Sequence, residues 1–218
     1  MHHFSYSEFR SVRCVTLSKE PSMKRLCHVV LLSLAAGALS MAAQAATDHN
    51  DDAVRAEQRA QQATQQLAEA LAGRLKASMR AGGPLAAIDT CHLEALGITD
   101  TTSEQAGLVV ARTALRVRNP NNAPDEWEQM QLERFGTALD AGASPRTLKA
   151  LERVDNGDGK HVWRYMQPIL TGGLCLQCHG DVLAPEVAAA IAERYPNDQA
   201  TGFALSSLRG AFTVTISE

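Results

Sequence analysis

The segment Cys175-Leu176-Gln177-Cys178-His179 places two thiols three positions apart, with an imidazole directly after the second thiol. No other feature of the sequence constrains the fold as much. In this C-x-x-C-H pattern the two thiols can add to the two vinyl groups of one porphyrin, and the adjacent histidine then lies beneath the iron as its proximal ligand. We therefore expect one covalently attached haem c, held by Cys175 and Cys178 and ligated by His179.

Two other interpretations of these cysteines stay open. A thioredoxin-like redox pair shares the C-x-x-C spacing but belongs to a βαβ context, whereas here the motif follows Thr171-Gly172-Gly173-Leu174 and an expected antiparallel hairpin. Half of a zinc site is the other alternative, although the sequence contains no second C-x-x-C and no H-x3-5-H.

The N-terminal residues indicate export. Met23-Lys24-Arg25 is a short basic segment, residues 29–42 are apolar or small, and Ala43-Gln44-Ala45 has the small-x-small pattern of a cleavage site. We expect a signal peptide over residues 23–45, a mis-assigned N-terminal extension over residues 1–22, and a periplasmic or secreted protein that does not span a membrane after cleavage. An uncleaved anchor is the alternative, but the apolar run is short for a bilayer.

Charge and cysteine content narrow the function classes. The chain carries 21 Lys and Arg against 24 Asp and Glu, a formal net charge of −3. Without a basic excess, nothing points to nucleic acid. Once the leader is removed, three cysteines remain, Cys91, Cys175 and Cys178, and an odd number argues against a simple disulfide framework.

Periodicity predicts an α+β fold. A long N-terminal helix is expected over residues 46–84, because apolar residues recur every four positions until the stop signal Gly82-Gly83-Pro84. Further helices are expected over residues 85–96, 125–141 and 185–194, and strands over residues 107–118, 148–154, 161–169 and 208–217. Short loops between the later strands favour an antiparallel sheet with helices on one side, forming a single domain over residues 85–218.

The second axial ligand is open at this stage. No methionine follows His179, so the downstream methionine of small electron-transfer cytochromes has no counterpart. The upstream candidates are Cys91, His92, His161, Met79, Met130 and Met166. Cys91 lies in a largely apolar segment, where a buried structural cysteine is the plain alternative, and for Met79 core packing is preferred.

Four segments resemble a known family: residues 87–91, 112–128, 175–180 and 208–214. Through them the chain resembles the small bacterial periplasmic c-type haem sensor domains with a PAS-like fold, long described as a domain of unknown function, over about residues 54–217. The stretch Arg118-Asn119-Pro120-x-Asn122-x-Pro124 is more specific than C-x-x-C-H alone.

The resemblance implies a PAS-like antiparallel sheet that holds the haem, with a long N-terminal helix. It also implies ligation by His179 and, as in some members, by a cysteine that matches Cys91; a thiolate ligand would favour ferric iron at rest. Arg116 and Arg118 become candidates for the haem propionates, on one face of the expected strand. The equal alternative is a solvated basic edge that pairs with Asp125, Glu126 and Glu128.

On these grounds we expect a mono-haem c-type protein that acts as a redox or gas sensor. No signalling module follows the domain, so a sensor would need a separate redox or signalling partner protein. A soluble electron-transfer cytochrome is the alternative. A peroxidase-type enzyme is less favoured, because no distal acid–base pair stands out, although His92 and His161 could serve.

Overall fold

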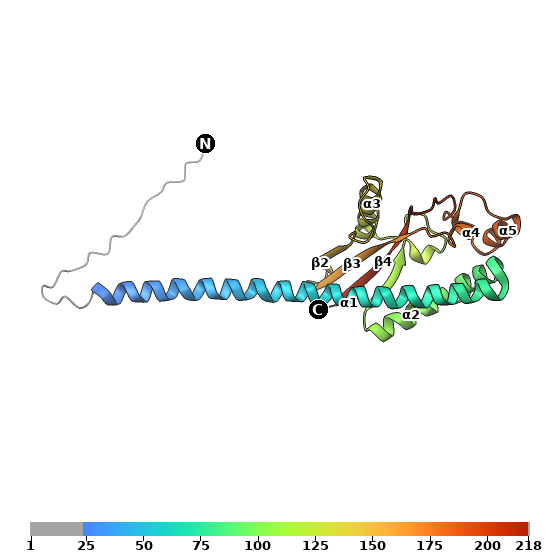
Figure 1. The fold of residues 1–218 in the computed structure, drawn as a ribbon. Helices are drawn as coiled ribbons and strands as arrows, with labels where there is room; N and C mark the ends of the chain where they lie inside the picture. The colour runs from blue at the N-terminus through green and yellow to red at the C-terminus, as the bar shows by residue number, and fades with distance from the viewer. Residues whose placement is uncertain (1–23, 218) are drawn as a thin grey trace, which may run out of the picture. The chain divides into compact units, whose positions relative to one another are not determined.

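The computed structural model describes the backbone of residues 24–217 and the side chains of residues 50–217. The helices and strands are, in chain order, α1 (Lys24–Leu93), α2 (Ala95–Ala106), β1 (Val109–Thr113), η1 (Pro120–Asn122), α3 (Glu126–Asp140), β2 (Ala150–Asp155), β3 (His161–Leu170), α4 (Leu176–His179), α5 (Pro185–Arg194) and β4 (Leu208–Ser217) (Figure 1). Two compact units are distinguished, Met1–His49 and Asn50–Glu218. The sheet and the candidate sites described below lie in the second unit.

The expected extension over residues 1–22 lies outside the described residues. The expected leader is helical from Lys24 onward, as either a leader or an anchor would be. In the part of the chain that the structure describes, no helix is both long and apolar enough to cross a membrane.

The predicted stop signal interrupts α1. Gly82 and Gly83 do not have helical backbone angles. Gly83 has a φ of 68°, a conformation that is energetically unfavourable for a residue with a side chain. Pro84 lacks an N–H and suits the first turn of the helical segment that follows. The helix therefore breaks and restarts, and the restarted segment up to Leu93 carries Cys91.

Four antiparallel strands form one sheet in the order β1-β4-β3-β2. The expected hairpin between β2 and β3 forms, with Gly157 and Gly159 at positive φ in its turn. β1 is shorter than expected: the chain leaves the sheet after Thr113, and the Ala114 N–H donates to the carbonyl of Asn122 instead of a strand. The predicted α+β arrangement with a long N-terminal helix is confirmed.

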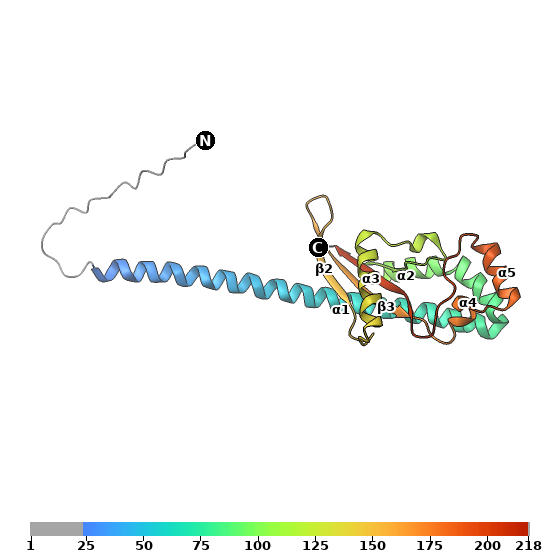
Figure 2. The ribbon, with the colours of Figure 1, turned by 90° about the horizontal axis from the view of Figure 1, so that it is seen from above.

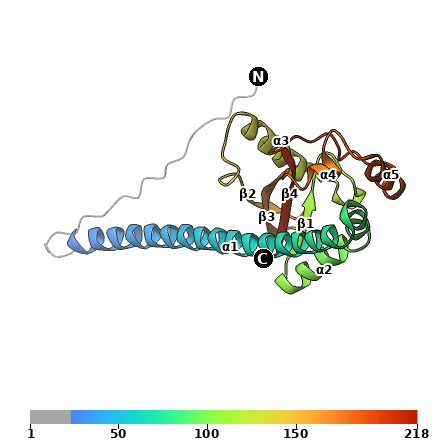
Figure 3. The same cartoon turned by 45° about the vertical axis from the view of Figure 1, so that its right-hand side comes forward.

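Helices cover both faces of the sheet, so the expectation of helices on one side is wrong. On one face α1 packs Ala60, Ala63 and Leu67 against Tyr165 and Val214. On the other face α3 packs Leu132 and Phe135 against Met166 and Ala211. Successive residues of a strand point to opposite faces, and Figure 3 shows α1 and α3 on opposite sides of the strands.

A third apolar cluster lies beyond the end of the sheet. Ile88 of the restarted α1 segment packs against Val187, Ile191 and Tyr195 of the α5 region, and Cys178 packs against the same group. Figure 2 shows α4 and α5 at the end where α1 breaks. This cluster brings the segment with Cys91 to the C-x-x-C-H motif.

Candidate functional site

The C-x-x-C-H motif folds into a single helical turn. The Cys175 carbonyl accepts from the N–H groups of Cys178 (3.1 Å) and His179 (2.9 Å), and the Cys175 N–H donates to Gly172. Both cysteines are free thiols and half-buried. Since residues three apart lie on one face of a helix, the turn presents both thiols to the same side.

The imidazole of His179 is held in one tautomer. Its Nδ1 lies 2.6 Å from the carbonyl oxygen of Ala200. A carbonyl can only accept, so Nδ1 carries the proton and donates, and Nε2 keeps its lone pair. Burial, together with the charges of Arg209 and Arg118, lowers the pKa of His179 to about 3. The side chain is therefore a neutral imidazole, the form that ligates metal ions.

Arg118 and Asp198 position the carbonyl that holds His179. The Arg118 guanidinium donates to both carboxylate oxygens of Asp198 at 3.0 Å, to the carbonyl of Cys178 at 2.7 Å and to that of Ala200 at 3.2 Å. Asp198 in turn accepts from the Ala200 N–H at 3.0 Å. Burial by itself would raise the pKa of Asp198, but hydrogen bonds and the charge of Arg118 outweigh it and lower that pKa. Arg118 thus ties the motif to the loop that follows α5.

Two further arginines flank the aromatic ring of Phe203. The Arg116 guanidinium lies 4.4 Å from the centre of this ring and that of Arg209 lies 5.0 Å from it. Arg116 Nε also donates to the carbonyl of Gln199 at 3.0 Å. The Phe203 ring meets the His179 ring edge-on at 6.3 Å. Burial, with the charges of Arg118 and Arg112, lowers the pKa of Arg209 to about 10.

The structure places Arg116 and Arg118 near the C-x-x-C-H motif, but they do not lie on a strand as expected. β1 ends at Thr113, so strand alternation does not apply to either residue, and both lie in the irregular segment before η1. The alternative of pairing with the acidic start of α3 is wrong. Asp125 and Glu128 bind Arg164 instead, at 2.6 and 3.0 Å.

Cys91 also lies beside the motif. An ion pair between Asp89 and Arg194 and the cluster around Ile88 attach its segment to α5. The Cys91 side chain is exposed, yet desolvation by the surrounding protein raises the pKa of its thiol, and the charges of Arg112 and Arg118 oppose this rise. Desolvation raises the pKa of the Cys178 thiol as well, the charge of Arg118 opposes the rise, and the charges of Cys91 and Cys175 add to it. The three cysteines of the second unit therefore share one electrostatic environment.

The other proposed ligands fare differently. Met166 is fully buried in the core under α3, and Met130 is exposed on that helix. His161 begins β3 opposite Asp155, at the hairpin. His92 is close to Cys91 in sequence, but its ring packs edge-on against Tyr195 at 5.2 Å. The contacts of Met166, Met130 and His161 do not involve the C-x-x-C-H turn, whereas Tyr195 belongs to the cluster against which Cys178 packs.

Sequence reasoning missed several residues of the site: Arg112, Tyr195, Asp198, Ala200, Phe203 and Arg209. Arg112 sits opposite Phe212 in the β1–β4 pairing, and its Nε is buried without a hydrogen-bond partner in the described structure. Burial lowers the pKa of Arg112, against the charges of Cys91 and Tyr195. Within residues 50–217, Asp198 is the one carboxylate that forms an ion pair with any of the four arginines here, so the site is strongly cationic.

A model of the Tll0287-like family matches residues 38–217. The chain belongs to the Tll0287-like family. The crystal structure of the cyanobacterial haem protein Tll0287 is similar to it, with 26% identity and a TM-score of 0.53 over 72% of this chain and 91% of that chain. A search of curated proteins gives no match. The comparisons confirm the expectation that the chain is related to haem proteins. The PAS-like sensor character stays a prediction.

Proposed function

We propose that this member of the Tll0287-like family binds one haem c, attached through Cys175 and Cys178 and ligated by Nε2 of His179. The observation that carries the proposal is the hydrogen bond from His179 Nδ1 to Ala200, which leaves Nε2 available beside two free thiols on one turn. Metal-ligating histidines characteristically donate their other ring N–H in this way. Similarity to a cyanobacterial haem protein supports the same cofactor.

In this proposal Cys91 would supply the second protein ligand to the iron. It is free, accessible and close enough to Cys178 to affect that thiol's pKa. Coordination deprotonates a thiol. Desolvation raises the pKa of Cys91, and the guanidinium groups of Arg112 and Arg118 oppose that rise by favouring the thiolate. The residues present therefore fit a haem iron that an imidazole and a thiolate would ligate.

The arginines of the site suit the propionate carboxylates of haem c. Haem c carries two propionate carboxylates, which arginine recognises through paired hydrogen bonds. Arg118 is already paired with Asp198, so it is better described as a positioning residue. Arg116, Arg209 and Arg112 are the cations available to the propionates, because no ion pair with a carboxylate occupies them in the described part of the chain.

We further propose that the protein is exported and acts as a redox or gas sensor rather than an enzyme. Haem, when bound, supplies one-electron chemistry and affinity for small gases. The chain supports a switch because its two proposed ligands lie on separate elements: Cys91 follows the break in α1, and His179 ends α4. If haem is held as proposed, a movement of the Cys91 segment would leave the hydrogen bond between His179 and Ala200 in place. A soluble electron carrier, with both ligands bound in both redox states, is the second candidate.

Visible and electron paramagnetic resonance spectra of the exported protein test the ligands. We expect ferric features of thiolate ligation that are lost in Cys91→Ala and kept in His92→Ala, the matched neighbour. A sensor releases Cys91 on reduction and then binds carbon monoxide, whereas a carrier stays six-coordinate. Spectra unaffected by Cys91→Ala contradict thiolate ligation.

Covalent attachment and export need separate measurements. The haem should remain on the polypeptide in a denaturing gel and be lost from a Cys175→Ser/Cys178→Ser double variant. Absence of haem from the intact protein would refute the proposal and favour a redox dithiol. N-terminal sequencing of the exported chain should start near Ala46, and a start at Met23 would contradict cleavage.

A further inference from the structure

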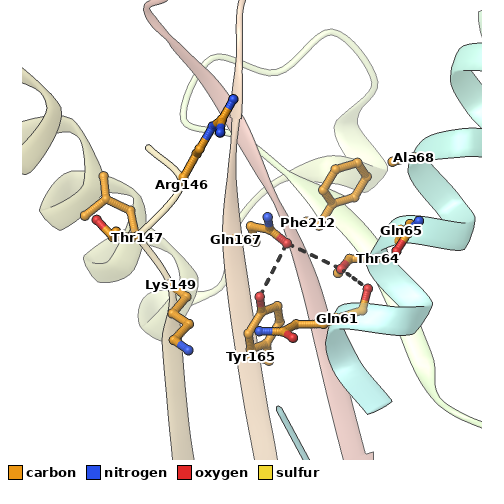
Figure 4. Close-up of a pocket in the computed structure, with 11 residues that line it drawn as sticks. Gln61, Thr64, Gln65, Ala68, Arg146, Thr147, Lys149, Tyr165, Gln167 and Phe212 are labelled. Carbon is orange, nitrogen blue, oxygen red and sulfur yellow. Dashed lines mark hydrogen bonds between the residues drawn. The ribbon is translucent and has the colours of Figure 1, made fainter. Parts of the chain in front are cut away.

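A second concave site lies between α1 and the sheet. Its volume is about 720 Å³, and its walls come from α1 near Thr64, from the loop and strand start at residues 146–149, and from β3 and β4 (Figure 4). None of the residues of the C-x-x-C-H site lines it. The cavity is therefore separate from the proposed haem ligands.

The charged side chains that line the cavity are all cations. Two cations, Arg146 and Lys149, line the cavity, and none of the lining residues in the described structure is Asp or Glu. Lys149 pairs with Glu57 of α1. Arg146 is exposed, and it forms no ion pair or hydrogen bond with any side chain or backbone group of residues 50–217. Its guanidinium is therefore available to an anion.

A polar network fixes a donor in the same cavity. Oε1 of Gln167 accepts from the Tyr165 hydroxyl at 3.3 Å. The Thr64 hydroxyl donates chiefly to the Gln61 carbonyl at 2.9 Å and lies 3.5 Å from the same Oε1, as the dashed lines in Figure 4 show. With Oε1 occupied, the amide nitrogen of Gln167 is left to donate. Burial, aided by the charge of Glu57, raises the pKa of Tyr165 to about 12, so this hydroxyl adds no negative charge. The aromatic ring of Phe212 supplies an apolar wall.

We propose that this cavity binds a small organic carboxylate with an apolar body and a further hydrogen-bond acceptor. The carboxylate pairs with Arg146, the body lies against Phe212, and the acceptor receives the Gln167 amide. The volume lies in the range of small-molecule sites, which combine apolar walls with a few fixed polar groups. Here polar side chains such as Thr64 and Gln167 share the lining with the apolar Ala68, Leu148 and Phe212. The proposal stands whether or not the cysteine motif carries haem.

Calorimetric titration of the purified, haem-loaded full chain with 4-hydroxybenzoate tests it. This probe carries a carboxylate, an aromatic body and a hydroxyl. We expect saturable binding at one site and none with 4-hydroxybenzamide, the uncharged counterpart. Loss of a hydrogen-bonded charge costs about tenfold or more in affinity, so Arg146→Gln should raise Kd by about that factor. Arg134→Gln, an exposed arginine of α3 outside the cavity, should leave Kd unchanged.

Three results would overturn the proposal. They are no saturable binding to the wild type, equal binding of the benzamide, and an Arg146→Gln variant that binds as tightly as the wild type. The last would also be seen if the carboxylate bound at the arginines beside Cys91. Because Arg146 is on an exposed loop, the variant is expected to fold, and an unchanged circular dichroism melt verifies this. Gln167→Leu gives a second variant, with weaker binding expected.

Discussion

Replacing Asp198 by asparagine is expected to destabilise the fold. The side chains of Arg118 and Asp198 are only 11% and 8% exposed, so the substitution leaves a buried guanidinium without its counter-charge. Removing one partner of a buried ion pair costs about 3–5 kcal/mol. Arg118 keeps its bonds to the carbonyls of Cys178 and Ala200, and asparagine keeps one acceptor. We therefore expect the lower end, a loss of about 3 kcal/mol in the free energy of unfolding.

The pH dependence of this loss provides an internal check. The pKa of Asp198 is lower in the fold than its ordinary value, which is about 3.9 for aspartate. A group with a lowered pKa stabilises the fold above its unfolded pKa, and this contribution disappears as pH falls through the folded value. The difference between wild type and Asp198→Asn should be complete at pH 7 and shrink below about pH 4.

Urea denaturation of the purified protein, followed by circular dichroism, measures the effect. Glu94→Gln is the matched control, because it removes an ion pair with Arg74 whose side chains are 42% and 43% exposed, and exposed pairs stabilise little. In the proposed haem-bound form, the Asp198 variant should also perturb the visible spectrum. The asparagine NH2 cannot accept from Arg118, so Arg118 and the Ala200 carbonyl that it contacts shift against His179. Equal denaturation midpoints for the two variants at pH 7 would refute this reasoning.

Three further substitutions test a close backbone approach, the packing of the core and the pKa of a buried tyrosine. Gly210→Ala would put a Cβ 2.4 Å from the backbone oxygen of Thr113, so β1 and β4 must separate; a thermal melt should show a loss of about 2–3 kcal/mol, and an unchanged melting temperature would contradict the close approach. Phe135→Ala empties a site that is 1% exposed and should cost about 3–5 kcal/mol in urea denaturation; a loss below about 1 kcal/mol would exclude a tightly packed core. Tyr165 has its pKa raised to about 12, so its contribution is present below about pH 10 and lost as pH rises towards that value; Tyr165→Phe should show a shallower alkaline decline in stability, and parallel declines would argue against the shift.

Local sequence signals predicted much of the fold. The boundaries of β4 and α5 match the expectation, since the strand alternates apolar residues and the helix begins at Pro185. The break at Gly82 and Gly83 was predicted from residue type. α2 was missed beyond residue 96 because its buried positions include Thr99 and Thr102. Their hydroxyls bond back to the carbonyls of the preceding turn, so a polar sequence forms a buried helix face.

Residue spacing alone predicted the site only where it is continuous in sequence, and the family resemblance supplied Cys91, Arg116 and Arg118. Cys175, Cys178 and His179 lie on one turn, so their spacing alone predicts their arrangement. Asp198 is 80 residues from Arg118 and Ala200 is 21 residues from His179. No local pattern joins residues so far apart. Arg112 and Arg209 lie in the segments that carry the family resemblance. Their burial depends on the pairing of β1 with β4, which the sequence does not reveal, so they could not be distinguished from arginines on the surface.

The cationic excess of the site connects its fold to its proposed ligand. Burying charge without a counter-charge is costly, and burial lowers the pKa of both Arg112 and Arg209. One carboxylate, Asp198, pairs with a member of this group in the described part of the chain. The two propionates of a haem c would add two negative charges to this group, while a thiolate at Cys91 would balance the single positive charge of a ferric porphyrin. The propionates would therefore offset two of the three arginines that Asp198 does not pair with, and the proposed cofactor would stabilise these buried cations.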